Sequence, residues 1–126
     1  EASSKAYAAA GVTAADLDLA ELYAPCTIVQ ALVSEAMDLV PRGQAGRAAT
    51  DGETALGGRL PICTSGGCLS RGHPSYITGL LTIFELWEQL THRAGERQEK
   101  DAALAAASCE LGNYNAALIH ILEAKA

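Results

Sequence analysis

The sequence predicts a layered α/β domain, and three observations lead to this expectation. Stretches with helical apolar spacing alternate with short apolar runs that are typical of strands. The last two runs are separated by Gly112 and Asn113, a pair that favours a β-hairpin. The length of 126 residues corresponds to about one domain, residues 1–126. We therefore expect a mixed sheet that is covered by helices and ends in a hairpin.

Three helices are predicted from apolar spacing and from end signals. The first covers residues 4–10, with Ser4 as N-cap and Gly11 as stop signal. The second covers residues 27–40 and ends before Pro41. The third begins after Pro74 and carries an apolar stripe on one face, formed by Ile77, Leu80, Leu81, Phe84, Trp87 and Leu90.

Strands are predicted where short apolar runs occur. Residues 17–22 form one such run, and the closing hairpin is expected over 103–109 and 116–122. Residues 41–73 are rich in glycine and lack sustained periodicity, which predicts a long irregular loop. Loops of this length are commonly functional. The charged residues between 93 and 100 are expected to form a solvated turn.

Composition excludes several classes of function. The net charge is −6 and the nine basic residues are scattered, so the electrostatic footprint of a nucleic-acid-binding protein is missing. No apolar run of 18 residues occurs and no basic–apolar leader opens the chain, so we expect no membrane span and a cytoplasmic protein. With 49% hydrophobic and 19% charged residues, part of the apolar surface is expected to face a partner.

The four cysteines are expected to be free thiols. Their spacing matches neither a CxxC pair nor a small disulfide framework. Cys63, Cys68 and His73 are close enough in sequence to ligate a metal, but structural zinc sites use tighter pairs and a fourth ligand. We therefore expect no metal site.

The first candidate for chemistry is Gly72-His73-Pro74, at the end of the glycine-rich loop. A helix N-terminus beside His73 favours the neutral imidazole and attracts oxyanions. Such a group can donate a hydrogen bond to a thioester carbonyl or move a proton. The alternative interpretation is a loop or capping histidine without catalytic duty.

An ordered set of motifs surrounds this histidine. TALGGRLP at 54–61, SGG at 65–67, LSRGHP at 69–74 and TG at 78–79 follow one another. Together they resemble the thiolase superfamily, above all thiolases of the sterol-carrier-protein or lipid-transfer type. The similarity covers almost the whole chain and implies a thiolase-like C-terminal half.

The resemblance implies a role for His73 and a need for partners. In the family this histidine forms an oxyanion hole and helps to activate a nucleophilic cysteine of the N-terminal half. That half is not in this chain, so we expect it on a separate polypeptide, unless the sequence is a fragment. A dimer or hetero-oligomer is expected, and an OB-fold protein with a zinc ribbon is a further partner of such proteins. Coenzyme A is implied as a substrate, with no covalently bound cofactor.

Two departures from the family pattern concern catalytic positions. Tyr23 stands where the family has an asparagine or histidine, so its phenol is a candidate hydrogen-bond donor or proton-transfer group. At the family's CxG motif the best register aligns Glu110, and Cys109 lies one residue away. A one-residue shift in a strand moves a side chain to the opposite face, so either residue or neither takes the acid–base role. Substrate-binding candidates are Gly72, Ser65, Gly66 and Tyr76.

Three hypotheses follow for the function. The leading one is thiolytic cleavage of a β-ketoacyl-CoA or the reverse condensation, with His73 and Tyr23 stabilising the enolate or oxyanion. The second is retro-aldol cleavage of a β-hydroxyacyl-CoA, such as a steroid side chain, which needs a base for the hydroxyl proton but no acyl-cysteine. The third is a non-catalytic half that supports assembly of a heteromeric complex.

Overall fold

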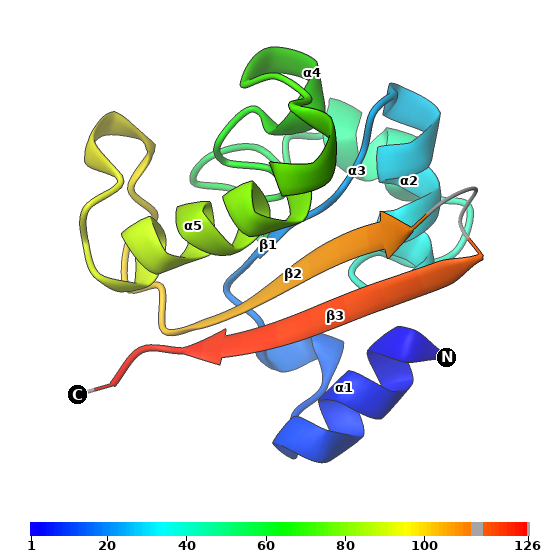
Figure 1. Cartoon of the computed structure of the whole chain (residues 1–126), viewed down its shortest axis with the longest axis horizontal. Helices are drawn as coiled ribbons and strands as arrows, with labels where there is room; N and C mark the ends of the chain where they lie inside the picture. The colour runs from blue at the N-terminus through cyan, green and yellow to red at the C-terminus, as the bar shows by residue number, and fades with distance from the viewer. Residues whose placement is uncertain (112–114, 126) are drawn as a thin grey trace.

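The computed structural model describes residues 1–111 and 115–125 and contains one three-stranded sheet with helices on both faces (Figure 1). Strand β1 runs parallel to the central strand β2, and β3 runs antiparallel to β2. This arrangement confirms the predicted α/β class and the closing hairpin; the predicted turn residues Gly112 and Asn113 lie outside the described residues. The elements are α1 (Ala2–Ala10), β1 (Leu19–Glu21), α2 (Thr27–Ala36), α3 (Ala45–Thr50), α4 (Gly67–Ser70), α5 (Thr78–Leu90), β2 (Leu104–Leu111) and β3 (Ala116–Glu123), with 3₁₀ turns at Ala14–Asp16, Ser75–Ile77 and Gly95–Arg97.

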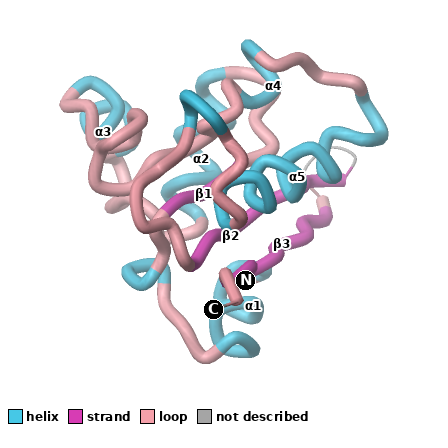
Figure 2. The backbone as a smooth tube through the Cα atoms, turned by 90° about the vertical axis from the view of Figure 1, so that its left-hand side faces the viewer, coloured by secondary structure: helices cyan, strands magenta, loops and turns pink. Residues whose placement is uncertain are grey.

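The two faces of the sheet have separate apolar cores. Ala20 and Ala106 point to the face on which α1 and the end of α2 pack, where Tyr7 and Met37 are buried with them. The alternate residues of the same strands point to α5, which covers β2 from the other side. Figure 2 shows the strands in succession, with α5 near β2 and α1 beneath β3. Small alanine side chains in β2 allow this close approach of the helices.

Most of the apolar stripe predicted on one face of α5 is turned outward. Leu80, Phe84 and Trp87 are 65%, 49% and 42% exposed, so these side chains lie outside both cores. Of the predicted stripe, Leu90 is buried. The side chains that α5 buries are largely polar: Thr78, Thr82, Glu85, Leu86, Gln89 and Leu90.

Four other local predictions are corrected. The first helix begins at Ala2 with Glu1 as N-cap, rather than at Ser4, whereas its stop at Gly11 is confirmed by a φ of 71°. Helix α2 ends at Ala36, because Asp38 takes a φ of 58° and turns the chain before Pro41. The loop of residues 41–73 contains the short helices α3 and α4. The charged segment 93–100 is not merely solvated, since its Glu99 is buried and its Arg97 binds an acidic side chain of α5.

Every helix in residues 1–111 and 115–125 is too short or too polar to cross a lipid bilayer.

Candidate functional site

Tyr23 and His73 meet at the carboxyl end of β1, although 50 residues separate them in the sequence. The Nε2 atom of His73 lies 2.9 Å from the phenol oxygen of Tyr23. The two rings are tilted by 55°, with their centroids 5.4 Å apart. The structure therefore brings together the two residues to which the leading hypothesis gives one shared task.

The backbone of β1 determines the direction of the Tyr23 side chain. The Tyr23 amide donates to the carbonyl of Ser108, 3.2 Å away, and so extends the pairing of β1 with β2. Side chains alternate between faces along a strand, which places the phenol on the α5 side together with Glu21. Burial raises the pKa of the Tyr23 phenol, and Cys68, Cys109 and Glu110 add electrostatic repulsion of its anion. Tyr23 therefore keeps its proton at neutral pH.

His73 lies on an exposed segment with unusual backbone geometry. Gly72 before it has a φ of 115°, a conformation that L side chains rarely adopt, and Ser75 after it has a φ of 54°. The 3₁₀ turn Ser75–Ile77 lies between the histidine and α5, so His73 is not directly at the start of that helix as predicted.

The pair can act in two directions, depending on the histidine tautomer. If Nε2 carries a proton, His73 donates to Tyr23, and the phenol O–H is free to donate to a substrate oxygen. If Nε2 is unprotonated, Tyr23 donates to His73, and the phenol oxygen is free to accept a substrate proton. Oxyanion stabilisation and proton removal are both within reach of this geometry.

Cys109 lies on the same face of the sheet as Tyr23. Its side chain packs against Gly79 in the first turn of α5, where an added Cβ would lie 2.6 Å from the cysteine sulfur. Position 79 must therefore remain glycine if the two elements are to stay this close. Burial raises the pKa of the Cys109 thiol, and Glu110 and Cys68 raise it further. The residue is a thiol at neutral pH.

Glu110 points to the opposite face of β2. It lines a hollow of about 220 Å³ together with Ala2, Val33 and Ala117, which belong to α1, α2 and β3. Its Oε1 accepts a hydrogen bond from Ser108, whereas its buried Oε2 has no partner among the described residues. Burial raises the pKa of this carboxyl to about 7. Of the two candidates at the CxG position, only Cys109 shares a face with Tyr23.

The raised pKa of Glu110 predicts a pH-dependent effect of Glu110→Gln on stability. A carboxyl whose folded pKa is about 7 holds its proton in the folded state while the unfolded chain is already ionised, so stability falls as pH rises from about 4.5 to 7. Glu110→Gln has no such carboxyl. From pH 5 to pH 8, its free energy of unfolding should therefore rise by about 1–3 kcal/mol relative to that of the wild type, after allowance for partial exposure. Thermal unfolding of the complete protein at both pH values measures the difference. The exposed Glu96→Gln serves as control, and equal pH dependence in all three proteins would refute the assignment.

The predicted substrate-binding residues have different surroundings. The Ser65 hydroxyl donates to Glu21 Oε2 over 2.9 Å, so its proton is used within the protein. Gly66 precedes α4 and has a φ of 82°. Tyr76 is fully exposed, three residues after His73. Their roles, and that of Gly72, stay predictions.

Sequence reasoning missed a buried polar network beneath α5. The carboxylate of Glu21, which is fully buried, and that of Glu85 both lie within hydrogen-bonding distance of the Thr64 hydroxyl. Gln89 donates to Glu85 and to the backbone carbonyl of Arg97. A signal was available, since polar residues recur every three or four positions along α5 and so share one face.

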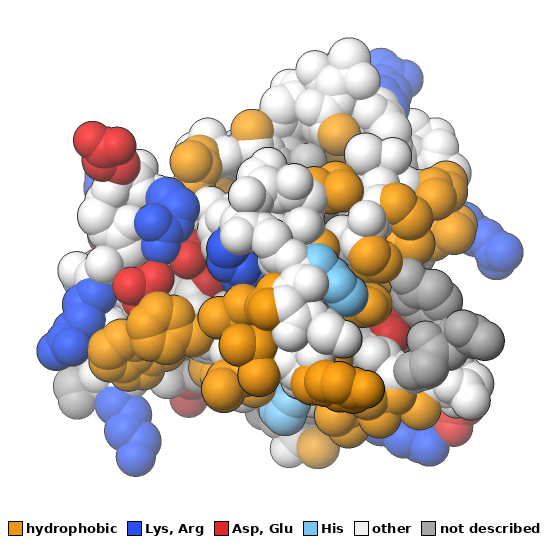
Figure 3. Space-filling model, turned by 45° about the horizontal axis from the view of Figure 1, so that its top comes forward, with side chains coloured by type: hydrophobic (Ala, Val, Ile, Leu, Met, Phe, Trp, Pro, Cys, Tyr) orange, Lys and Arg blue, Asp and Glu red, His pale blue; other side chains and the backbone are white. Residues whose placement is uncertain are grey.

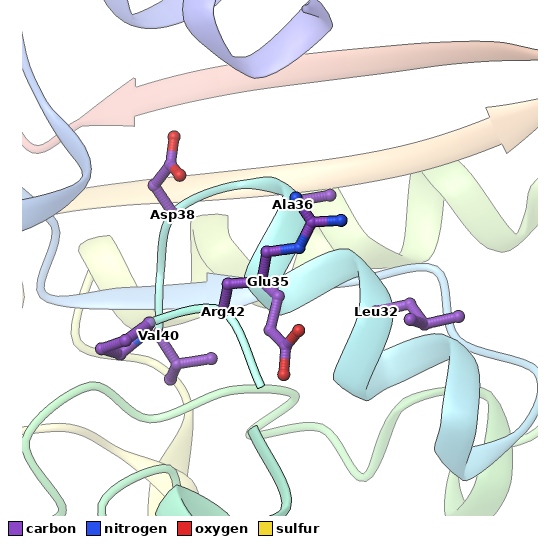
Figure 4. Close-up of a pocket in the computed structure, with 7 residues that line it drawn as sticks. Leu32, Glu35, Ala36, Asp38, Val40 and Arg42 are labelled. Atoms are coloured by element: carbon purple, nitrogen blue, oxygen red, sulfur yellow. The ribbon is translucent and has the colours of Figure 1, made fainter. Parts of the chain in front are cut away.

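A further hollow among the described residues lies away from Tyr23 and His73. It has a volume of about 720 Å³ and is formed by the end of α2 and the turn that follows. Figure 4 shows the carboxylates of Glu35 and Asp38 pointing in different directions from this turn. Glu35 accepts a hydrogen bond from the Ala45 amide and so fixes the start of α3. Within residues 1–111 and 115–125, no three His, Cys, Asp or Glu side chains are grouped to hold a metal ion.

Known proteins resemble this chain in sequence and in fold. It is 39% identical over 105 residues to sterol carrier protein 2 of Rattus norvegicus, covering 83% of this chain and 19% of that protein. It is 35% identical over 120 residues to an acetyl-CoA acetyltransferase of Methanothermobacter thermautotrophicus, covering 95% of this chain and 31% of the acetyltransferase. A solved structure described as "Ltp2-ChsH2(DUF35) aldolase" superimposes with a TM-score of 0.83 at 27% identity, over 98% of this chain and 31% of the aldolase chain.

These relatives are much longer than the present chain, which spans about a fifth of the first and less than a third of the other two. A family model described as "Thiolase C-terminal domain-like" matches residues 1–124. The chain therefore belongs to the thiolase C-terminal domain-like family.

Proposed function

We propose that this chain supplies the histidine-bearing part of an active site that breaks or forms a carbon–carbon bond beside an acyl-CoA thioester. The observation that carries this proposal is the 2.9 Å contact between His73 Nε2 and the Tyr23 phenol. Family membership supports an acyl-CoA as the class of substrate. Coenzyme A then enters as part of the substrate, and the scheme needs no covalently bound cofactor.

The chemistry of the pair favours retro-aldol cleavage of a β-hydroxyacyl-CoA. This reaction needs a group that takes the β-hydroxyl proton, and a phenol hydrogen-bonded to imidazole can pass its own proton on as it accepts another. Ordinary thiolysis instead needs a cysteine that exchanges its proton readily. The raised pKa of Cys109 argues against that role in this chain.

The proposed step balances in protons and electrons. Tyr23 takes the β-hydroxyl proton while its own proton moves to His73 Nε2. The released electron pair forms a carbonyl at Cβ, the Cα–Cβ bond breaks, and its electrons enter the thioester as an enolate. The return of one proton to Cα gives an acyl-CoA and a ketone or aldehyde. Donors for the enolate oxygen are assigned to the part of the thiolase fold that this chain lacks.

Thiolysis or condensation of a β-ketoacyl-CoA is the second candidate. It is favoured by the place of Cys109, on the same face of β2 as Tyr23 and against the first turn of α5. In that reaction His73 would donate a hydrogen bond to the thioester oxygen, and the nucleophilic cysteine would come from the N-terminal half.

The N-terminal half of a thiolase fold is the proposed partner, on a separate chain or on a longer form of this polypeptide. Leu80, Phe84 and Trp87 form an exposed apolar stripe on α5, which begins close to His73 in the sequence. Figure 3 looks toward this side of the molecule and shows hydrophobic side chains gathered in patches across it. Contiguous apolar patches of this kind mark protein interfaces. An OB-fold protein with a zinc ribbon stays a further possible partner.

The experiment that tests the function compares two substrates and two variants in the complete enzyme. We expect cleavage of a β-hydroxyacyl-CoA without added thiol, slowed at least about tenfold by Tyr23→Phe because the proton acceptor is lost. Cys109→Ala should leave this cleavage within about twofold of the wild type, as its thiol takes no part. The products are measured by mass spectrometry. Thiolysis of a β-ketoacyl-CoA that survives Tyr23→Phe and fails in Cys109→Ala would instead identify a thiolase.

A further inference from the structure

The two segments that carry the catalytic pair are tied together two residues upstream of each partner. Glu21 precedes Tyr23 by two positions in β1, and Arg71 precedes His73 by two positions in the loop. Ser65 lies between them: its hydroxyl donates to Glu21 Oε2 over 2.9 Å and accepts from Arg71 Nη1 over 3.1 Å. Glu21 and Arg71 themselves approach no closer than 4.0 Å, so the serine is the link.

The Glu21 carboxylate has its hydrogen-bond donors only when the loop 64–73 packs on β1. Its carboxylate is fully buried, and it also accepts a hydrogen bond from the Ser65 amide over 3.0 Å. The Ser65 amide and hydroxyl donate to Glu21, and the Thr64 hydroxyl, which also lies near Glu85, is within hydrogen-bonding distance of it; all three groups belong to the segment that leads to His73. A buried carboxyl without such partners is costly, so release of the loop is penalised.

Arg71 fixes the other end of the link. The same Nη1 atom that reaches Ser65 also donates to the carbonyl of Leu81 in α5, over 3.2 Å. The Arg71 guanidinium thus links the loop to α5 directly and to β1 through Ser65. His73 follows on an exposed stretch whose backbone takes a positive φ at Gly72. The position of the imidazole therefore depends on where Arg71 is held.

We propose that Glu21, Ser65 and Arg71 are positioning residues that hold His73 in hydrogen-bonding contact with Tyr23. The side-chain hydrogen bonds of the three run to one another, to the Thr64 and Gly67 segment and to Leu81 rather than to Tyr23 or His73. They act by holding β1 and the loop 64–73 at a constant separation, so that Nε2 and the phenol oxygen stay paired. The kinetic part of this proposal rests on the proposed function, whereas the pairing itself is measured independently.

The decisive variant is Ser65→Ala, with Ser70→Ala as a matched control on an exposed serine five residues away. The chain has three histidines, so ring-¹⁵N labelling of this chain in the complete protein gives few signals, and His73→Ala assigns that of residue 73. We expect the His73 ring signal to move in Ser65→Ala and in Arg71→Lys, and to stay in Ser70→Ala. Ser65→Thr, which keeps the hydroxyl, should restore it. An unmoved His73 signal in both Ser65→Ala and Arg71→Lys would overturn the proposal, whether or not the enzyme turns over the expected substrate.

Kinetics provide the second readout. Ser65→Ala should lower kcat by about 10- to 100-fold with KM within about twofold, because a misplaced catalytic group affects the chemical step. In a Tyr23→Phe background the same change should cost less than about twofold, since the pairing it supports is already lost. Equal losses in both backgrounds would show that Ser65 acts without the pair and would also overturn the proposal.

Discussion

Replacing His73 with alanine in the complete enzyme is expected to lower kcat by roughly 10²–10⁴-fold, the usual contribution of a positioned acid–base group. The imidazole is exposed, so its removal leaves both apolar cores and the polar network under α5 unchanged. In the proposed retro-aldol step, the change removes the group that accepts the Tyr23 proton over the 2.9 Å contact. Steady-state kinetics with a β-hydroxyacyl-CoA and with a β-ketoacyl-CoA measure the effect.

His120→Ala is the matched control for this prediction. His120 is also exposed but lies on β3, opposite Ala107 in the sheet register. Its replacement should change kcat by less than about twofold, as expected for a surface site away from the chemistry. Full turnover in His73→Ala with assembly preserved would favour the third hypothesis, in which the chain is a non-catalytic half.

The largest loss of stability is expected from Gln89→Leu. Gln89 is fully buried, its amide group donates to the carbonyl of Arg97 over 2.7 Å, and its oxygen accepts from the amide of Glu99 over 2.8 Å. Leucine fills a similar volume but leaves both backbone groups without partners. We expect the free energy of unfolding to fall by about 2–4 kcal/mol, since each buried unsatisfied group costs about 1–3 kcal/mol.

Hydrogen–deuterium exchange locates this effect, and a second glutamine controls it. Peptides that cover α5 and residues 95–100 should lose protection in Gln89→Leu, because the amide of Glu99 no longer has its acceptor. The exposed Gln44→Leu makes the same chemical change at the N-cap of α3 and should stay within about 0.5 kcal/mol of the wild type. Similar stabilities for the two variants would contradict the role given to the polar network.

Much of the fold could be predicted because the strands and α2 follow simple apolar periodicity. The element ends were harder, since Met37 and Val40 are buried by a turn rather than by a continuing helix. Helices α3 and α4 are short and contain glycine, so no periodic signal precedes them. These errors are local and leave the order of the main elements unchanged.

The residues of the candidate site and the shared task of Tyr23 and His73 could be predicted, but the geometry that joins them could not. Tyr23 and His73 were selected from motifs, but no pattern in the sequence states that residues 50 positions apart meet. The choice between Cys109 and Glu110 depended on strand register, which needs the pairing of β2 with β3 and with Gly79 of α5. The apolar stripe of α5 could be predicted from its spacing, but its direction could not, because an apolar stripe packs on a core of the same chain or on a partner.

Helix α5 has a largely polar buried side and an apolar exposed side, so two different constraints act on its sequence. Its inward residues, Glu85 and Gln89 among them, are held by directional hydrogen bonds, so their replacement leaves buried polar groups without partners. Its outward residues are exposed, so they are constrained only by the surface of a partner that packs on them. Substitutions at three or four exposed positions of α5 could therefore change which partner protein the chain binds, while the contact between Tyr23 and His73 is kept.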